Sequence, residues 1–270
     1  MRIFGKVKLE GIRSRLKSLG DAVTGLMYGQ PSECALCGEV TPRSKTFPFL
    51  TRRNGGPDFS LDTPPGICES CLDKLSRQMS WVCEVCGAPL RPPLPVCPDC
   101  QKCLYLFDGQ RSAGIYEGYL KSAIIRMKYQ GERWLSRPLG WLVARAALEF
   151  MPLDIVVPIP VEPGSRIRRG YNQALDLAKE VSGLLEIPLL DILARDKRYS
   201  HQVDLGRKMR WRNLQESMVA TCEINLRGQR CLLVDDVTTT GATLDEAARV
   251  LKKLGAEKVY CATVARTLRH

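Results

Sequence analysis

Two adjacent carboxylates, Asp235 and Asp236, stand between an apolar run and a loop rich in hydroxyl groups. The run Cys231 to Val234 is typical of a buried strand, and the spacing from Leu244 to Leu254 predicts a helix. This order brings backbone N–H groups and the start of a helix to one point, which favours an anion. The carboxylates beside it suit sugar hydroxyls, or Mg²⁺ bound largely through water. A phosphate, a diol and Mg²⁺ together describe a phosphorylated ribose. Helix capping alone would need only one acid beside the first turn.

The run from Cys231 to Thr243 resembles the phosphoribosyl-pyrophosphate (PRPP) motif of type I phosphoribosyltransferases. The resemblance implies that Asp235 and Asp236 hold the ribose hydroxyls, whereas the following loop holds the 5′-phosphate. The implied phosphate loop consists of Thr238, Thr239, Thr240, Gly241, Ala242 and Thr243. Purine-specific members often have an Asp general base in this loop, at the position of Thr239. Because Thr has no useful basicity at neutral pH, purine chemistry by that route is not favoured, and a base supplied elsewhere or an acceptor that needs none stays open.

Nine of the twelve cysteines lie between residues 34 and 103, in four CxxC pairs, two of which are followed by Gly. This pattern predicts structural Zn²⁺ in tetrahedral Cys₄ sites. Sequential pairing gives Cys34, Cys37, Cys68 and Cys71 as one site, and Cys83, Cys86, Cys97 and Cys100 as the other. Interleaved pairing, a role for Cys103 in place of Cys100, and redox-active CxxC pairs are the alternatives. Cys222, Cys231 and Cys261 are expected to be small core residues.

Length and charge suggest three segments in the 270 residues: a basic helical segment 1–30, a zinc-ribbon segment 31–107 and an α/β domain 108–270. Their net charges are +4, zero and +7. The basic excess of the last segment fits polyphosphate ligands, nucleic acid or a solvated surface. No apolar run is long enough to span a membrane, and the N-terminus lacks a secretory signal, so we expect a cytoplasmic protein. The amphipathic segment 1–30 is expected to pack on the zinc segment, with peripheral contact to the inner membrane face as the alternative.

Helical and strand patterns alternate from about residue 108, which predicts a doubly wound α/β fold with a parallel sheet. Ligands then bind at the carboxyl ends of strands, where Asp235 and Asp236 would meet the loop that follows the predicted strand Ile155 to Val157. Arginines in and after that loop suit the oxygens of pyrophosphate. They are Arg166, Arg168, Arg169 and Arg195. The basic stretch Arg195 to Arg212 is interpreted as a loop that closes over pyrophosphate, or as a solvated basic helix.

Further motifs resemble the ComF family of competence-associated proteins. They are the Cys₄ region, Tyr116 to Lys121, Met127 to Gly131, the loop Pro158 to Gln173, and Arg195 with His201, Gln202, Arg210, Arg212 and Asn213. The resemblance covers about residues 31–267. It implies a double zinc ribbon joined to a type I phosphoribosyltransferase domain, PRPP and Mg²⁺ as ligands, and a link to DNA uptake.

Three functions are compatible with these observations. The first is transfer of phosphoribosyl from PRPP to an unidentified acceptor. The second is an accessory protein of natural transformation that binds single-stranded DNA and other competence proteins. The third is a PRPP-sensing regulator. Because aromatic residues make up only 7% of the chain and form no basic aromatic strand, the sequence does not favour base stacking on single strands. The oligomeric state is left open.

Overall fold

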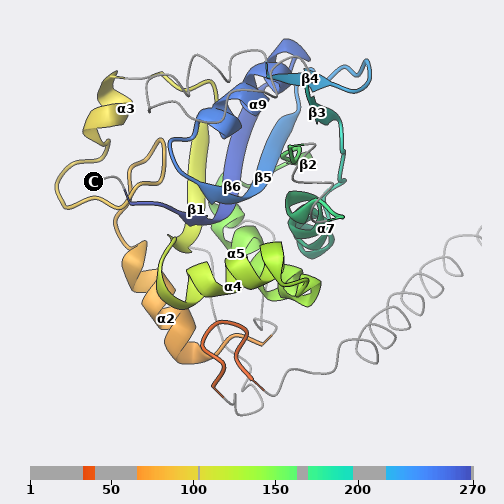
Figure 1. Ribbon diagram of the computed structural model, residues 1–270. Helices are drawn as coiled ribbons and strands as arrows, with labels where there is room; N and C mark the ends of the chain where they lie inside the picture. Colours follow the sequence, from red (N-terminus) through yellow and green to blue (C-terminus); the bar gives the residue numbers. More distant parts are fainter. Residues whose placement is uncertain (1–32, 40–65, 103, 163–169, 197–216, 269–270) are drawn as a thin grey trace, which may run out of the picture.

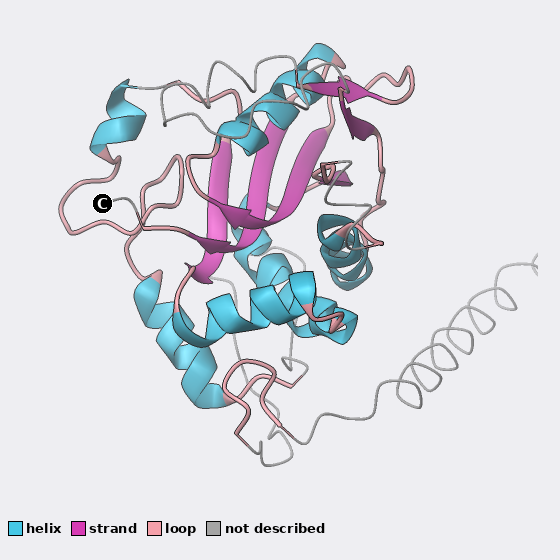
Figure 2. Cartoon of the chain, in the orientation of Figure 1, coloured by secondary structure: helices cyan, strands magenta, loops and turns pink. Residues whose placement is uncertain are grey.

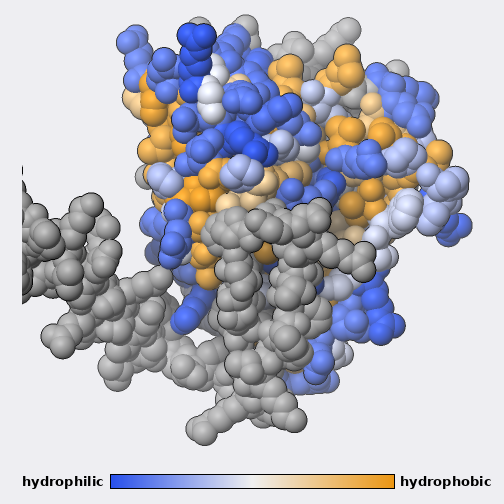
Figure 3. Space-filling model, turned by 180° about the vertical axis from the view of Figure 1, so that it is seen from behind, coloured by the Kyte–Doolittle hydropathy of each residue, from blue (hydrophilic) through white to orange (hydrophobic). Residues whose placement is uncertain are grey.

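The computed structural model describes residues 33–39, 66–102, 104–162, 170–196 and 217–268. The basic segment 1–30 and Cys103 lie outside these ranges. Within them, no helix is long and apolar enough to cross a membrane. The face seen in Figure 3 carries hydrophilic and hydrophobic residues side by side.

A four-stranded parallel sheet in the order β1-β6-β5-β2 forms the centre of the structure (Figure 1). The strands are β1 (Gly109–Ile115), β2 (Ile155–Pro158), β5 (Arg230–Thr238) and β6 (Lys258–Arg266). All four residues of β2 are buried, as expected for a parallel strand covered on both faces. A separate antiparallel pair joins β3 (Leu193–Arg195) to β4 (Met218–Ala220). The predicted α/β fold is confirmed.

Helices cover both faces of this sheet (Figure 2). One face carries α4 (Gly118–Tyr129), α5 (Ser136–Ala147) and α7 (Gln173–Leu185), with the short 3₁₀ turns η1 (Arg133–Leu135) and η2 (Leu148–Phe150) at the ends of α5. The other face carries α9 (Ala242–Lys253). Side chains alternate along β5. Leu232 and Val234 therefore pack against the face covered by α4, α5 and α7, whereas Cys231 and Leu233 pack under α9.

The sequence pattern does not predict strand β1, because part of its buried side is polar. Gln110 and Ser112 are both buried, and the Ser112 hydroxyl lies 2.7 Å from that of Thr263 on β6. Helix α2 (Glu69–Gln78) packs against this strand. A β-carbon on Gly114 would come within 2.5 Å of a Leu75 methyl group, so glycine is needed for this close contact.

The cysteine-rich segment packs on the same sheet. Leu36, Ile67 and Leu75 join the core formed by α4 and α5. The second half of the segment, with α3 (Pro98–Lys102), forms a smaller cluster around four cysteines. Cys231 and Cys261 are core residues as predicted, but the prediction for Cys222 is wrong, because its side chain is exposed in a bend after β4.

Candidate functional sites

The two carboxylates lie within the carboxyl half of β5, and not after its end as the short apolar run had indicated. Strand β2 stops pairing at Pro158, opposite Val234, whereas β6 continues alongside β5 as far as Thr238. Asp235 and Asp236 therefore stand at the edge where one neighbouring strand has ended and the other still supports them. This edge is where a parallel sheet binds its ligands.

A lysine side chain from another part of the fold contacts this acid pair. Lys128, in the last turn of α4, places its Nζ 2.6 Å from Oδ1 of Asp236. The side chains are 17% and 7% exposed, so water screens the pair only weakly. Burial alone would lower the pKa of Lys128, but the charge and hydrogen bond of Asp236 outweigh it and raise that pKa.

The negative charge of Asp235, the other carboxylate, is compensated less than that of Asp236. Burial, followed by the charge of Asp236, raises the pKa of Asp235 to about 7, while Lys128 acts in the opposite direction. Oδ1 of Asp235 accepts a hydrogen bond of 2.8 Å from the backbone N–H of Asp236. The site thus holds two crowded acids that gain from any further hydrogen-bond donor or cation.

The predicted phosphate loop connects β5 to α9. Gly241 precedes the helix with φ +85° and ψ −3°, a left-handed conformation that strains any residue with a β-carbon. The Thr240 hydroxyl accepts a hydrogen bond of 3.3 Å from the Ala242 N–H. Thr239 is exposed, and Thr238 is buried as the last residue of β5. The first turn of α9 therefore opens beside the acid pair, as an anion site requires.

The chain that follows the second cysteine cluster holds this loop in place. The Tyr105 hydroxyl donates to the Thr240 carbonyl at 3.0 Å, and the Leu106 N–H donates to Oδ1 of Asp245 at 2.5 Å. The Tyr105 ring stacks on Phe107 with ring centroids 4.4 Å apart. Because Asp245 is in the first turn of α9, both hydrogen bonds reach the start of that helix.

The loop after β2 is described up to residue 162 and again from residue 170. Asn172 caps α7 by accepting from the Ala174 N–H at 3.0 Å, and its amide donates to the Ile159 carbonyl at 3.2 Å. The Tyr171 hydroxyl donates to the Met127 carbonyl. The loop is thus tied to β2, α7 and α4. Arg166, Arg168 and Arg169 lie outside the described residues.

Arg195, the last residue of β3, contacts the described start of this loop. Its Nε donates to the Pro160 carbonyl at 3.3 Å. Burial lowers its pKa, and the charges of Glu162, Asp235 and Glu246 act against that shift. Most of the basic stretch 195–212 lies outside the described residues. The side-chain Oε1 of Gln173 at the start of α7 is buried, and the described structure gives it no hydrogen-bond partner.

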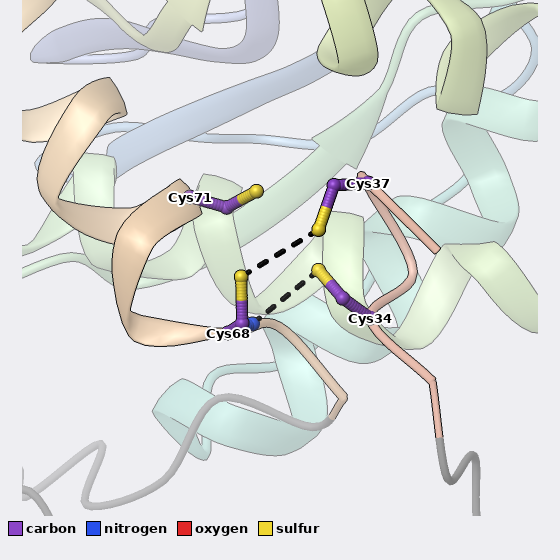
Figure 4. A group of neighbouring side chains, drawn as sticks. All are labelled: Cys34, Cys37, Cys68 and Cys71. Carbon is purple, nitrogen blue, oxygen red and sulfur yellow. Dashed lines mark hydrogen bonds between the residues drawn. The ribbon is translucent and has the colours of Figure 1, made fainter. Parts of the chain in front are cut away.

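The cysteines form two four-membered groups in the sequential pairing. In each group the sulfur atoms all lie within 4.8 Å of one another. Each combines a turn that ends in a left-handed glycine, Gly38 or Gly87, with a CxxC at the start of a short helix, α2 or α3. In Figure 4 the four sulfurs of the first group point toward a common centre. Cys100 completes the second group, whereas Cys103 lies outside the described residues.

These groups fit a tetrahedral Zn²⁺ ion. Four sulfurs about 2.3 Å from one ion stand about 3.8 Å apart. The Cys37–Cys68 and Cys86–Cys97 sulfur pairs are 3.7 and 3.8 Å apart. The backbone N–H of Cys68 points at the Cys34 sulfur at 3.4 Å, and that of Cys97 at the Cys83 sulfur at 3.3 Å. Such N–H groups stabilise thiolates, and four protein ligands leave no position open for substrate.

An arginine supports each cysteine turn from the α/β part of the chain. Arg126 of α4 donates to the Ala35 carbonyl at 3.1 Å. Arg266, 2% exposed at the end of β6, donates to the Cys86 carbonyl and, at 3.0 Å, to Oε1 of Gln110. Sequence patterns assign no role to Arg266, Tyr105 or Lys128. Only the motif Met127 to Gly131, which contains Lys128, carried a signal.

Comparison with known proteins places these features in context. Residues 169–269 match the family described as phosphoribosyl transferase domain. Competence protein F of Haemophilus influenzae is 34% identical over 209 residues, which cover 74% of this chain and 90% of that protein. Competence protein ComFC of Bacillus subtilis is 28% identical over 230 residues, covering 82% and 89%. DNA utilization protein YhgH of Escherichia coli is 26% identical over 227 residues, covering 76% and 99%.

Proposed function

Because this chain belongs to the competence protein F (ComF) family and carries a phosphoribosyltransferase-like domain, we propose that it binds PRPP with Mg²⁺ and transfers the phosphoribosyl group to an acceptor. One observation carries the proposal. The carboxylates Asp235 and Asp236 lie at the ligand-binding edge of the sheet, directly before the Gly241 turn that opens α9. A diol site therefore adjoins an anion site.

The residues have distinct roles in the proposed reaction. Asp235 and Asp236 accept hydrogen bonds from the ribose hydroxyls and hold the sugar. The N–H groups at the start of α9 and the hydroxyls of Thr238 to Thr243 hold the 5′-phosphate. Arg195 stabilises the pyrophosphate that leaves C1 through an oxocarbenium-like transition state, together with Arg166, Arg168 and Arg169 of the loop after β2. Mg²⁺, when bound with PRPP, supplies positive charge for the same leaving group.

Calorimetric titration with PRPP in the presence of Mg²⁺ tests the site. The double variant Asp235→Asn/Asp236→Asn is expected to lose at least tenfold in PRPP affinity, about 1.4 kcal/mol. Asp191→Asn, at an exposed position between α7 and β3, is the matched control and keeps wild-type affinity. Unchanged affinity in a double variant with wild-type circular dichroism would reject the site.

We further propose that each Cys₄ group binds one structural Zn²⁺, which gives two ions per chain. The sulfur geometry supports this assignment. Metal analysis of Cys100→Ser is expected to show one ion fewer than wild type. Cys222→Ser, at an exposed cysteine outside both groups, is expected to keep both ions.

Because reduced thiolates bind the metal, the proposal includes a cytoplasmic location. It keeps 31–107 and 108–270 as the boundaries of the zinc and catalytic segments.

Binding of single-stranded DNA is a second candidate, supported by the relatives named for competence and DNA utilization. Net charge +7 over residues 108–270 adds to it. Non-specific contacts to phosphate predict a log–log salt slope of about −0.7 per phosphate neutralised. Titration of a labelled oligonucleotide at two salt concentrations measures that slope. Added PRPP is expected to compete if the stretch 195–212 makes the contact. Undetectable binding at low salt would remove this candidate.

A further inference from the structure

Lys128 stands out among the charged groups of the candidate PRPP site. Its ammonium contacts Asp236 at 2.6 Å, and the two side chains are largely shielded from water. Helix α4, which carries it, follows the edge strand β1 in the chain and packs on the opposite face of the sheet from α9. The free protein therefore compensates the charge of Asp236 with a cation of its own.

The end of α4 is held in a way that sets the position of this ammonium. Tyr171, in the chain that returns from the loop after β2, donates its hydroxyl to the Met127 carbonyl. Arg133 stacks over the Tyr171 ring, 4.8 Å from its centroid, and pairs with Asp176 of α7 at 2.8 Å. The backbone at Lys128 is thus tied to the loop that carries the candidate pyrophosphate arginines. Its flexible side chain reaches Asp236, one of the two acids proposed to hold the ribose.

We infer that Lys128 is a further substrate-binding residue: its ammonium occupies the acid pair in the free protein and moves from Asp236 to the pyrophosphate oxygens when PRPP and Mg²⁺ bind. This inference rests on the function proposed above. The exchange follows from electrostatics, because an ammonium on a carboxylate repels a divalent ion from the same oxygens. It also follows from desolvation, because a shielded carboxylate that loses one cation must gain another partner.

The inference predicts opposite effects on two ligands. Removal of the ammonium in Lys128→Met frees the carboxylates, so Mn²⁺ alone is expected to bind at least tenfold more tightly than to wild type. The same variant is expected to bind PRPP at least tenfold more weakly, since the pyrophosphate loses a cation. Mn²⁺ binding is measured by electron paramagnetic resonance without PRPP, and PRPP binding by calorimetry with Mg²⁺. A purely structural ion pair would change both affinities in the same direction.

Three further variants protect the result against misfolding. Lys121→Met, at an exposed lysine of the same helix, is expected to leave both affinities unchanged. Lys128→Met/Asp236→Asn removes both charges, so it is expected to fold like wild type and to lose the gain in Mn²⁺ affinity. Lys128→Arg keeps the charge and is expected to bind PRPP more tightly than Lys128→Met does.

Two results would overturn the inference: Mn²⁺ affinity unchanged or reduced in folded Lys128→Met, or PRPP affinity unchanged or increased in it. Failure of the proposed function has a different signature, because wild type itself would then not bind PRPP. In that case the Mn²⁺ experiment still decides whether Lys128 blocks the acid pair, since it does not require PRPP.

Discussion

Arg266→Met is expected to damage the second cysteine group selectively. The arginine is 2% exposed and donates to two buried acceptors, the Cys86 carbonyl and Oε1 of Gln110. Its charge also lowers the pKa of the Cys86 thiol, against the larger raising effects of the hydrogen bond with Cys83 and of burial. Methionine fills much of the same volume but donates no hydrogen bond and carries no charge.

The magnitude follows from the two acceptors left without a donor. Each unsatisfied buried group costs about 1–3 kcal/mol. Relief of the buried guanidinium offsets part of this cost, so we expect a loss of about 3 kcal/mol in the free energy of unfolding. Arg126→Met is the matched comparison at the first cysteine group. The Arg126–Glu132 pair is 28% and 29% exposed, so water can replace its hydrogen bonds and the expected loss is about 1 kcal/mol.

Urea unfolding measures the stability of both variants, and a colorimetric chelator measures zinc release. Because the binding energy of a structural metal is part of the folding energy, Arg266→Met is expected to release one zinc faster than wild type and to retain the other. Equal losses of stability in the Arg266 and Arg126 variants would refute this reasoning. So would release of both ions at the same rate.

Three smaller changes test the site around α9. Tyr105→Phe removes the 3.0 Å hydrogen bond to the Thr240 carbonyl. The loss of about 1 kcal/mol is expected to weaken PRPP binding, measured by calorimetry, up to about fivefold. Unchanged affinity would show that this hydrogen bond does not support the loop. Gly241→Ala forces a β-carbon into φ +85°, so thermal unfolding is expected to show a loss of about 1–2 kcal/mol, whereas Gly183→Ala in α7 has open space and no such strain. Burial and the neighbouring aspartate raise the pKa of Asp235 from 3.8 to about 7, so the folded state binds this proton more tightly than the unfolded chain, and stability falls as pH rises from about 4 to 7. Asp235→Asn is expected to lose this decrease in urea unfolding at several pH values, and parallel curves for the two proteins would contradict it.

The strand–loop–helix around the acid pair could be predicted because its signals are local. The apolar residues, the glycine turn and the following helix periodicity all lie within one stretch of chain. The end of β5 could not be predicted in the same way. Pairing with β6 extends it through Asp235 and Asp236 to Thr238, and that support comes from residues nearly 30 positions further along the chain. Hydrophobic pattern alone stops at Val234.

Polar burial explains the main element that the sequence analysis missed. Strand β1 turns Gln110 and Ser112 into the structure, where Ser112 pairs with Thr263 and Gln110 with Arg266. A strand whose buried side is polar shows no alternation of apolar and polar residues. Cys222 is the opposite case: a small apolar residue near a strand is typical of a core, but no neighbouring element of the described structure buries this side chain and it is exposed.

The two cysteine groups show which features local spacing predicts and which depend on tertiary contacts. Spacing predicted the CxxC turns and their glycines, because a two-residue spacer acts locally. Spacing left the pairing open, and the structure resolves it as sequential. The groups then differ in their surroundings. The first joins the core under α4, whereas the second sends Tyr105 and Leu106 to the start of α9. The second cysteine group and the candidate phosphate loop are therefore linked by a short stretch of chain, and loss of the zinc proposed there is expected to loosen the loop before it unfolds the sheet.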